Sequence, residues 1–385
     1  MSSKIIYCTE CLYPNTKPHL FFDDKGVCSA CNSFKSRSKI DWQDREKQFQ
    51  KFVDNLKKNT DNKYHCLIPV SGGKDSTYQV IKILESGLNP LCVTASTCSL
   101  TELGRENIKN LQSLGVDHIE FTSNPKIRKK INKIALETVG DISWPEHNMI
   151  FTVPIHVALQ NDINTIIWGE NVQFEYGGPS NEAEKNHLDH NWLQEFGGLN
   201  GLRVSDFVGL EGIQEKDLLY YKFPDPDLLT KKKIIGIYLG YYFPWDSIKN
   251  KEISQKNGLK TWHSNLEGAI FDCENLDNYQ AGIHEYFCFL KFGFARATTQ
   301  ANMMIRRKKI SRKDALKLVT ENEGKFPLTY MEKKTQEILS DIGISMDKFI
   351  EICDKFTNRK IFKTNKEGKL IKDNLLNLTK INIDN

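Results

Sequence analysis

The segment SGGKDS, residues 71–76, constrains the fold more than any other stretch of this chain. It follows a short apolar run, HCLIPV at 65–70, which predicts a buried strand. It precedes DSTYQVIKILESG at 75–87, whose apolar residues recur at helical spacing. A strand, a glycine-rich loop and a helix in this order direct backbone N–H groups at a bound anion, so the sequence predicts a phosphate site. A Walker loop is excluded, because Asp75 follows Lys74 where that pattern requires Ser or Thr.

Further strands and helices alternate after this loop. Apolar runs predict strands at 89–97, 117–123 and 164–171, and a helix at 101–116 lies between the first two. Such alternation indicates an α/β fold with a doubly wound parallel sheet. Ligands of these sheets bind at the carboxyl ends of the strands, where the strand order reverses. An amphipathic helix at 42–58 leads into the sheet, with Phe49, Phe52, Val53 and Leu56 expected to face inward.

Four cysteines stand in two CxxC pairs near the N-terminus: Cys8, Cys11, Cys28 and Cys31. This spacing indicates one tetrahedral Zn²⁺ bound by four thiolates. Four protein ligands leave no open position, so the zinc is predicted to be structural. An iron–sulfur centre and a redox dithiol are the alternatives. The other six cysteines are scattered, as expected of buried thiols in a reducing compartment.

Composition argues for a globular protein, with 39% hydrophobic residues, 26% charged residues and a net charge of +4. No apolar run approaches the length that spans a bilayer, and the first residues lack the apolar core of a secretory signal. We therefore expect a cytoplasmic protein with no membrane partner. Nucleic acid is not expected as a partner, and the basic run KIRKKINK at 126–133 is interpreted as the solvated face of a helix, although such a run could touch phosphates.

The loop matches the SGGxDS motif of the PP-loop ATP pyrophosphatases. Within that superfamily, the chain resembles the N-acetyl sugar amidotransferases of pseudaminic acid and lipopolysaccharide O-antigen biosynthesis. The resemblance is carried by CTEC…CSAC, by WGENVQFEYGG at 168–178 and by the segment at 284–319, and it covers most of residues 5–320. It implies that Mg·ATP binds at 71–76 and that AMP is placed on the acetamido oxygen of a sugar or nucleotide sugar. Ammonia then displaces the AMP, which leaves an acetamidino group.

The resemblance and the chemistry of the side chains give candidate site residues. The ATP-binding residues are Ser71, Gly72, Gly73, Lys74, Asp75, Ser76 and Asn171. The catalytic residues are Lys74, Asp75, Glu170 and Arg296, with Glu170 holding Mg²⁺. The substrate-binding residues are Glu175, Tyr176, Gly177, Lys291, Arg296 and Arg306. Two alternatives stay open. Glu170 and Asn171 could form only a helix cap or a turn, and the cations of the third motif could lie on the surface of a helical domain. Thr299 stands where the family pattern suggests Asp.

The ammonia source is expected to be a separate glutaminase subunit. Residue 2 is Ser rather than the Cys of an N-terminal glutaminase, and none of the ten cysteines has a nucleophile-elbow context. The zinc segment is a possible docking surface for that subunit. The alternative activity is tRNA thiolation, for which Cys98 is the candidate sulfur carrier, although a lone cysteine of this kind is more often inert.

Three regions are predicted: a zinc module and linker at 1–45, a PP-loop domain at 46–260 and a mostly helical C-terminal region at 261–385 that contributes to substrate binding. Within the second, the Gly- and Asn-rich segment 178–205 is interpreted as a mobile substrate loop, and His187 and His190 as weak metal-ligand candidates.

Overall fold

The structure is a computed structural model that describes residues 5–177 and 199–381. Ser2, Gly178, His187 and His190 lie outside the described residues, as does most of the segment 178–205. Among the described ranges, no helix is long and apolar enough to cross a membrane.

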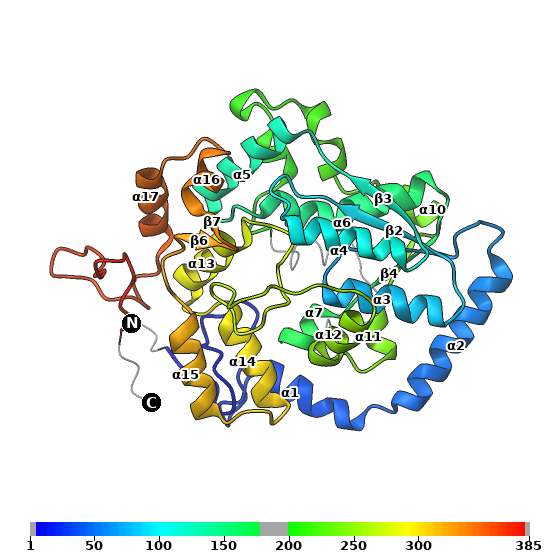
Figure 1. Ribbon diagram of the computed structural model, residues 1–385, viewed down its shortest axis with the longest axis horizontal. Coiled ribbons are helices and arrows are strands. Elements are labelled where there is room, and N and C mark those ends of the chain that lie inside the picture. Colours follow the sequence, from blue (N-terminus) through cyan, green and yellow to red (C-terminus); the bar gives the residue numbers. More distant parts are fainter. Residues whose placement is uncertain (1–4, 178–198, 382–385) are drawn as a thin grey trace.

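A five-stranded sheet forms the centre of the fold, and its strands are parallel, as predicted (Figure 1). Its strands are β1 (Cys66–Pro69), β2 (Pro90–Ala95), β3 (Asp117–Phe121), β4 (Thr165–Trp168) and β5 (Ile235–Tyr238). Their order is β3-β2-β1-β4-β5. The chain leaves β1 toward one edge and later returns to the other side of β1, so the strand order reverses between β1 and β4. A parallel doubly wound sheet binds its ligands at this kind of position.

Both faces of the sheet are covered by helices, which is why the buried strands β1, β2 and β4 read as mainly apolar runs, whereas the edge strand β3 is half-exposed and carries polar residues. The helices next to it are α3 (Lys74–Glu85), α4 (Glu102–Ser113), α5 (Pro125–Val139), α6 (Trp144–Gln160) and α12 (Ser247–Lys256). Side chains alternate along β1: Leu67 packs in the core with α5 and α6, whereas Cys66 and Ile68 pack in the core with α3. Each face therefore has its own hydrophobic core, and the sheet lies between them.

Between β4 and α12, the described residues form several short elements besides β5. They are α7 (Val172–Tyr176), η2 (Val204–Phe207), η3 (Leu210–Gly212), η4 (Glu215–Tyr221), α10 (Pro226–Lys231) and α11 (Leu239–Tyr242). At the start of the chain lie α1 (Ser29–Ser36), η1 (Arg37–Lys39) and α2 (Trp42–Asn59). Helix α2 faces the core as predicted, with Phe49 and Val53 buried and Phe52 and Leu56 partly buried.

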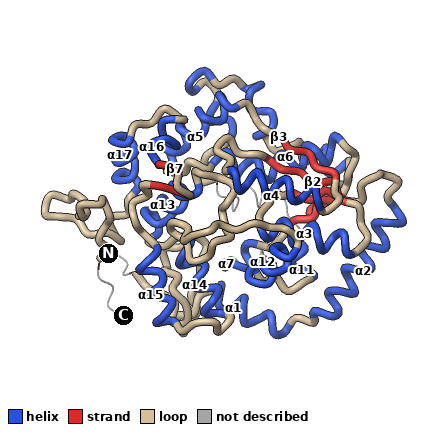
Figure 2. Tube along the Cα trace, in the orientation of Figure 1, coloured by secondary structure: helices blue, strands red, loops and turns tan. Residues whose placement is uncertain are grey.

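The C-terminal region is mostly helical, as predicted, and Figure 2 shows that most strand segments lie in the other part of the molecule. Its elements are α13 (Ala281–Phe292), α14 (Arg296–Arg306), α15 (Arg312–Asn322), β6 (Thr329–Tyr330), β7 (Lys333–Lys334), α16 (Thr335–Ser340) and α17 (Met346–Phe356). Beyond α17, the chain forms isolated β-bridges, such as that between Phe362 and Lys380.

The N-terminal segment packs against these C-terminal helices (Figure 1). The backbone N–H of Leu12 donates to Asn302 Oδ1 at 2.7 Å, and Thr16 Oγ1 donates to the carbonyl of Phe292 at 2.6 Å. The N-terminal segment and the C-terminal helices thus share an interface.

Candidate active site

The glycine-rich loop follows β1 at the point where the strand order reverses. Helix α3 begins at Lys74, and Gly73 is its N-cap. Ser71 Oγ accepts a hydrogen bond from Gly73 N at 3.3 Å, and Ser76 Oγ donates to Gly73 O at 3.1 Å. These bonds hold the loop as an open turn whose next element is a helix N-terminus, the geometry suited to an anion.

Gly72 brings the loop directly against the backbone of α4. Its φ is +83°, and a Cβ atom there would lie 2.9 Å from Ile108 N and 3.0 Å from the carbonyl carbon of Asn107. Because both obstacles are main-chain atoms, no side-chain movement could relieve the clash. The loop therefore requires glycine for its conformation and for its close approach.

We expect Gly72→Ala to lower the melting temperature and to reduce turnover of ATP at least about tenfold, because displacing the loop by even 1 Å disturbs substrate positioning. Gly115→Ala is the matched control: Gly115 has φ +86°, but no atom lies within 4 Å of the added Cβ. The control should show only the conformational cost, roughly 1–2 kcal/mol. Equal melting temperatures for the two variants would contradict the close approach.

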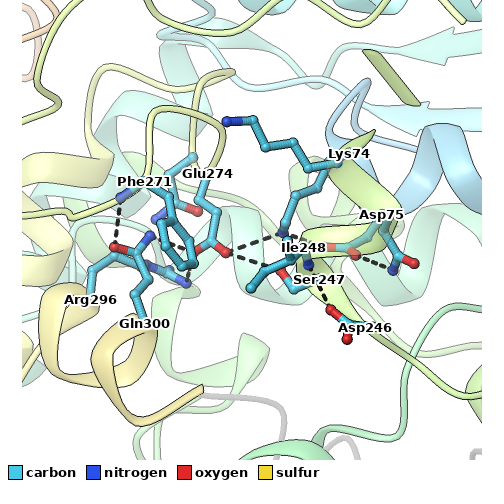
Figure 3. Close-up of polar contacts among 12 residues, drawn as sticks. Lys74, Asp75, Asp246, Ser247, Ile248, Phe271, Glu274, Arg296 and Gln300 are labelled. Carbon is cyan, nitrogen blue, oxygen red and sulfur yellow. Dashed lines mark hydrogen bonds and ion pairs between the residues drawn. The ribbon is translucent and has the colours of Figure 1, made fainter. Parts of the chain in front are cut away.

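Lys74 is buried at the start of α3 and lies between two carboxylates (Figure 3). Its Nζ lies 2.6 Å from Asp75 Oδ2 and 3.2 Å from Glu274 Oε1. Burial alone would lower the pKa of Lys74, but the charges of Asp75 and Glu274 outweigh it and raise that pKa. Lys74 is therefore a fixed cation at the phosphate loop. Asp75 is held in turn, because its Oδ1 accepts from Asn250 Nδ2 at 2.8 Å.

Glu274 joins the loop to the C-terminal helices. Its Oε2 accepts from Gln300 Nε2 at 3.0 Å and lies 3.4 Å from Arg296 Nη1, so Figure 3 shows Lys74 and Arg296 approaching it from two sides. These cations overcome the effect of burial and hold the pKa of Glu274 at about 2. Arg296 is itself fixed, since its Nε and Nη2 donate to Glu285 Oε1 at 3.0 and 2.5 Å.

Sequence reasoning missed Glu274 and Glu285. Glu274 lies in the segment FDCENLDN at 271–278, which matches no motif. Its only signal was a run of acidic and amide residues in a stretch without helical spacing. Nothing in the sequence indicates that Glu274 lies beside the loop at 71–76, which is about 200 residues earlier in the chain.

Glu170 lies at the same site, after the end of β4. Burial, followed by the neighbouring charge of Asp75, raises the pKa of Glu170 to about 7. A divalent cation between Glu170 and Asp75 would offset the unfavourable charge of Asp75 on the buried Glu170 carboxylate. The nearby charges agree, because Lys74 and Arg296 face four carboxylates: Asp75, Glu170, Glu274 and Glu285. Asp75 and Glu170 could therefore hold Mg²⁺.

Two cavities that share several lining residues lie at the loop. The first has a volume of about 220 Å³ and is lined by the loop together with Glu170, Tyr176, Glu274 and Arg296. The second, of about 460 Å³, shares Ser71, Asp75, Ser76, Glu170 and Arg296 with the first, and extends over the carboxyl ends of β1, β2 and β4 to apolar residues such as Val93 and Trp168. A polar cavity beside an apolar one suits a phosphorylated ligand that also carries a flat, apolar group.

Four of the proposed substrate residues contact other parts of the protein. Glu175 forms an ion pair with Arg37, and its carbonyl accepts from Arg306 Nη1 at 3.3 Å. Gly177, at φ +85°, packs against Ala30 of the zinc module, and a Cβ there would lie 2.8 Å from the Ala30 nitrogen. Lys291 donates to the carbonyl of Val139 at 2.8 Å and lines a third cavity. Of the substrate candidates, Tyr176 and Arg296 line the loop cavity.

Three other sequence residues have defined surroundings. Asn171 Oδ1 accepts from Phe174 N at 3.4 Å, which is the capping contact named as the alternative for this residue. Thr299 faces the N-terminal segment, where its Oγ1 accepts from Tyr13 Oη at 3.3 Å. The departure from the family pattern therefore falls on an interface.

Burial, followed by the charge of Glu146, raises the pKa of Cys98 to about 11, so this thiol is protonated at neutral pH.

The four N-terminal cysteines converge on one point. All four are buried, and their sulfur atoms lie within 4.8 Å of one another. Cys11 and Cys28 sulfurs are 3.6 Å apart, and those of Cys8 and Cys31 are 4.0 Å apart. A tetrahedron with Zn–S bonds of about 2.3 Å has edges of roughly 3.8 Å, so the cluster fits zinc.

Arg306 lies beside this cluster rather than beside the phosphate loop. Its guanidinium lies over the Tyr13 ring, 5.4 Å from the centroid. Burial would lower the pKa of Arg306, but Tyr13 and the cysteines Cys11 and Cys31 raise it. A zinc ion with four thiolates carries two net negative charges, and Arg306 is placed to offset one of them.

The strand order, the SGGKDS loop after β1 and the cluster of four cysteines define a PP-loop type of α/β protein with an N-terminal zinc-knuckle module. Residues 273–375 match the family described as "LPS biosynthesis protein WbpG-like, C-terminal domain". This part of the C-terminal region, which is similar to that family, supplies Glu274, Glu285 and Arg296 to the candidate site.

A protein of Methanocaldococcus jannaschii described as uncharacterized is 31% identical over 107 residues, which are 27% of this chain and 38% of that protein. Three solved structures are also similar: a "predicted subunit of tRNA methyltransferase" from M. jannaschii (15% identity, 61% of this chain, 91% of that chain, TM-score 0.29), NMN synthetase from Francisella tularensis (10%, 59%, 99%, 0.28) and NH3-dependent NAD synthetase from Campylobacter jejuni (14%, 59%, 100%, 0.27). Because these TM-scores are low, the fold assignment relies on the strand order and the glycine-rich loop of this chain and not on these structures.

Proposed function

We propose that the protein is an ATP-dependent amidotransferase that converts the N-acetyl group of a bacterial surface-glycan sugar into an acetamidino group. The acceptor is a pseudaminic acid-type sugar or a related nucleotide sugar, and the other products are AMP and pyrophosphate. One observation carries the proposal: the cavity of the phosphate loop receives Glu274 and Arg296 from the region that matches the WbpG-like family. A phosphate site and a domain associated with LPS biosynthesis thus contribute to one pocket.

The chemistry explains why ATP is needed. An amide oxygen is a poor leaving group, so the acetamido oxygen first attacks the α-phosphorus and pyrophosphate leaves. The carbon then carries an O-AMP group. Attack by ammonia on that carbon breaks its bond to oxygen, and the electron pair leaves with AMP. In this scheme the backbone at 71–76 and Lys74 stabilise the departing pyrophosphate.

Magnesium fits the excess of carboxylates at this site. Asp75 and Glu170 would hold it, and the ion would neutralise charge on the phosphates. Arg296 and Tyr176 line the loop cavity and are proposed to contact the reacting part of the substrate. Glu175, Gly177 and Arg306 are proposed to act indirectly, by fixing α7 and hence Tyr176. Lys291 and Asn171 remain candidates for the acceptor and for ATP.

Ammonia is proposed to come from a separate glutaminase subunit. One side of the zinc module contacts α13 to α15, as in the hydrogen bond from Arg312 Nε to the carbonyl of Cys11 at 3.2 Å. A docked subunit would therefore use another side of that module. Activity with glutamine and no added partner would contradict this part of the proposal.

The thiolation alternative is less well supported. The protonated Cys98 is a weak nucleophile. Much of the basic run at 126–133 is engaged within the protein, since Arg128 pairs with Glu146, Lys129 with Asp341 and Lys133 with Glu211. Several cations of that run thus already have partners within the protein, whereas RNA binding would require a row of free cations.

The proposal predicts the products of a direct assay. The protein is incubated with Mg·ATP, ammonium and a panel of N-acetylated sugars and their nucleotide-linked forms, and adenine nucleotides and sugar masses are measured. We expect AMP together with a sugar whose mass has changed by the exchange of O for NH. ADP in place of AMP would overturn the proposal, and AMP formed only with tRNA and a sulfur donor would favour thiolation.

A further inference from the structure

A third cavity lies beyond the two that surround the phosphate loop. It has a volume of about 530 Å³ and is lined by parts of the zinc segment, α7, the turn before α6, and α13. His147 and His284 line both this cavity and the 460 Å³ cavity. Tyr176 lines both this cavity and the 220 Å³ cavity. The two histidines thus stand at the boundary between the nucleotide-sized space and a separate approach to it.

Both histidines face the carboxylate of Asp141, whose side chain is only 2% exposed. Asp141 Oδ1 lies 2.9 Å from His284 Nδ1, and Oδ2 lies 3.4 Å from His147 Nδ1. The carboxylate is also held by Ser143 N at 2.9 Å and Asn200 Nδ2 at 3.1 Å. It is therefore a fixed, buried acceptor.

This contact sets the tautomer of His284. An imidazole whose Nδ1–H donates to a carboxylate carries its lone pair on Nε2. Among the described residues, Nε2 of His284 has no hydrogen-bond partner. A buried carboxylate, an oriented imidazole and an unengaged Nε2 form the arrangement that makes histidine a general base.

Charge supports the geometry. Burial would lower the pKa of His284, but the charge and the hydrogen bond of Asp141 raise it, with a further contribution from Glu285 and an opposing one from Arg296. The histidines in turn keep the pKa of Asp141 low despite its burial. Asp141 thus stays ionised while it strengthens the basicity of His284.

We propose that His284, oriented by Asp141, is the general base that accepts a proton from ammonium as the nitrogen nucleophile enters the nucleotide cavity. This rests on the proposed function. Ammonium gives one proton to Nε2, and the resulting ammonia uses its lone pair to form the C–N bond. The C–O bond breaks with its electron pair going to AMP, and the product amidine keeps the proton it needs to become an amidinium. Asp141 is a positioning residue, and His147 completes the polar boundary.

The test compares two nitrogen nucleophiles, of which one must lose a proton before it can attack and the other need not. Ammonia is almost entirely protonated at neutral pH, whereas hydroxylamine is almost entirely neutral and requires no proton acceptor before attack. We expect His284→Gln to lower amidine formation from ammonium about 10²-fold, the usual size of a general-base contribution. Hydroxylamine should restore the rate to within about threefold of wild type. The N-acetylated sugar or nucleotide sugar that wild type uses best in the panel is the acceptor, and products are followed by mass.

Two variants refine the result. Asp141→Asn keeps an oxygen facing Nδ1 but loses the charge, so it should show a smaller loss with the same dependence on nucleophile. His156→Gln is the matched control, because His156 is a half-buried histidine whose Nε2 lies 2.9 Å from the carbonyl of Lys222, and it lines none of these three cavities. It should behave as wild type with both nucleophiles.

The outcomes distinguish this proposal from the proposed function. Equal losses with ammonium and hydroxylamine in His284→Gln would reduce the histidine to a structural role. A second metal equivalent in wild type that is lost in His284→Gln would make the cluster a metal site and overturn the base. Absence of any amidine from wild type with either nucleophile would instead overturn the proposed function, and this inference with it.

Discussion

Replacing Lys74 with glutamine is expected to lower AMP formation by about 10²–10³-fold, the usual cost of removing a preorganised group that stabilises developing charge. Lys74 is the buried cation at the phosphate loop, and its position is fixed by Asp75 and Glu274 on either side. Glutamine is nearly as long but neutral, so the departing pyrophosphate would lose its fixed positive partner. AMP release under saturating Mg·ATP measures the effect.

Stability is measured alongside, because the substitution leaves Asp75 and Glu274 without their shared cation. Breaking a buried ion pair typically costs about 3–5 kcal/mol. Here Arg296 and Gln300 still contact Glu274, and Asn250 still donates to Asp75, so the cost should lie at or below the lower end of that range. A cooperative thermal transition in the variant would show that lost activity is not lost folding.

Lys82→Gln is the matched control on the same helix. Lys82 forms an exposed pair with Glu85 at 2.7 Å, three residues along α3, and such pairs contribute little. We expect its AMP formation and melting temperature to match wild type. If Lys74→Gln also retained wild-type AMP formation, the loop would not be the pyrophosphate site.

The sequence was informative where structure depends on neighbouring residues. The strands at β1 to β4, the loop at 71–76 and the four-cysteine cluster follow from short patterns, because burial, turn chemistry and metal ligation are each decided within a few residues. The inward face of α2 follows from helical spacing for the same reason. The fold class could therefore be derived without the structure.

The candidate site was only half predictable, because it is assembled from distant segments. Lys74 was identified, but its partner Glu274 was not, and nothing in the sequence linked Asp141 to His284. The charge of a residue also does not predict where in the fold it lies. The sequence suggests Arg306 as a substrate residue, but its side chain lies by the cysteine cluster, and Lys291 lines a different cavity from the phosphate loop. A positively charged residue that becomes buried needs an anionic partner, but the sequence does not identify that partner.

The N-terminal cysteine segment contacts the candidate site through helix α7, a link that neither its motif nor its position in the chain suggested. Helix α7 lies between the two: Gly177 packs on Ala30 and Glu175 pairs with Arg37 on one side, while Tyr176 lines the loop cavity. The same module binds α14 through Asn302. Folding of the cysteine segment should therefore influence both the position of Tyr176 and the packing of the C-terminal helices.

Cys11→Ser is accordingly expected to lose the metal, to lower the melting temperature strongly and to abolish AMP formation. Binding of structural zinc contributes about 10–16 kcal/mol to the folding of isolated zinc-finger segments. A segment of this size has too small a core to replace that contribution. Zinc content per chain, measured by elemental analysis, should fall from one equivalent to none, and a chelator that removes the metal from wild type should reproduce the loss of stability.

Cys98→Ser is the control with the same chemical change. Cys98 is half-buried, and its thiol lies 3.7 Å from Asn132 Oδ1, a bond that a serine hydroxyl can also make. It should keep its zinc, its melting temperature and its AMP formation, which would also exclude Cys98 as a required sulfur carrier. If Cys11→Ser bound no zinc yet kept its activity, the module would be a separate appendage, and the contacts of Gly177 and Glu175 would not govern the site.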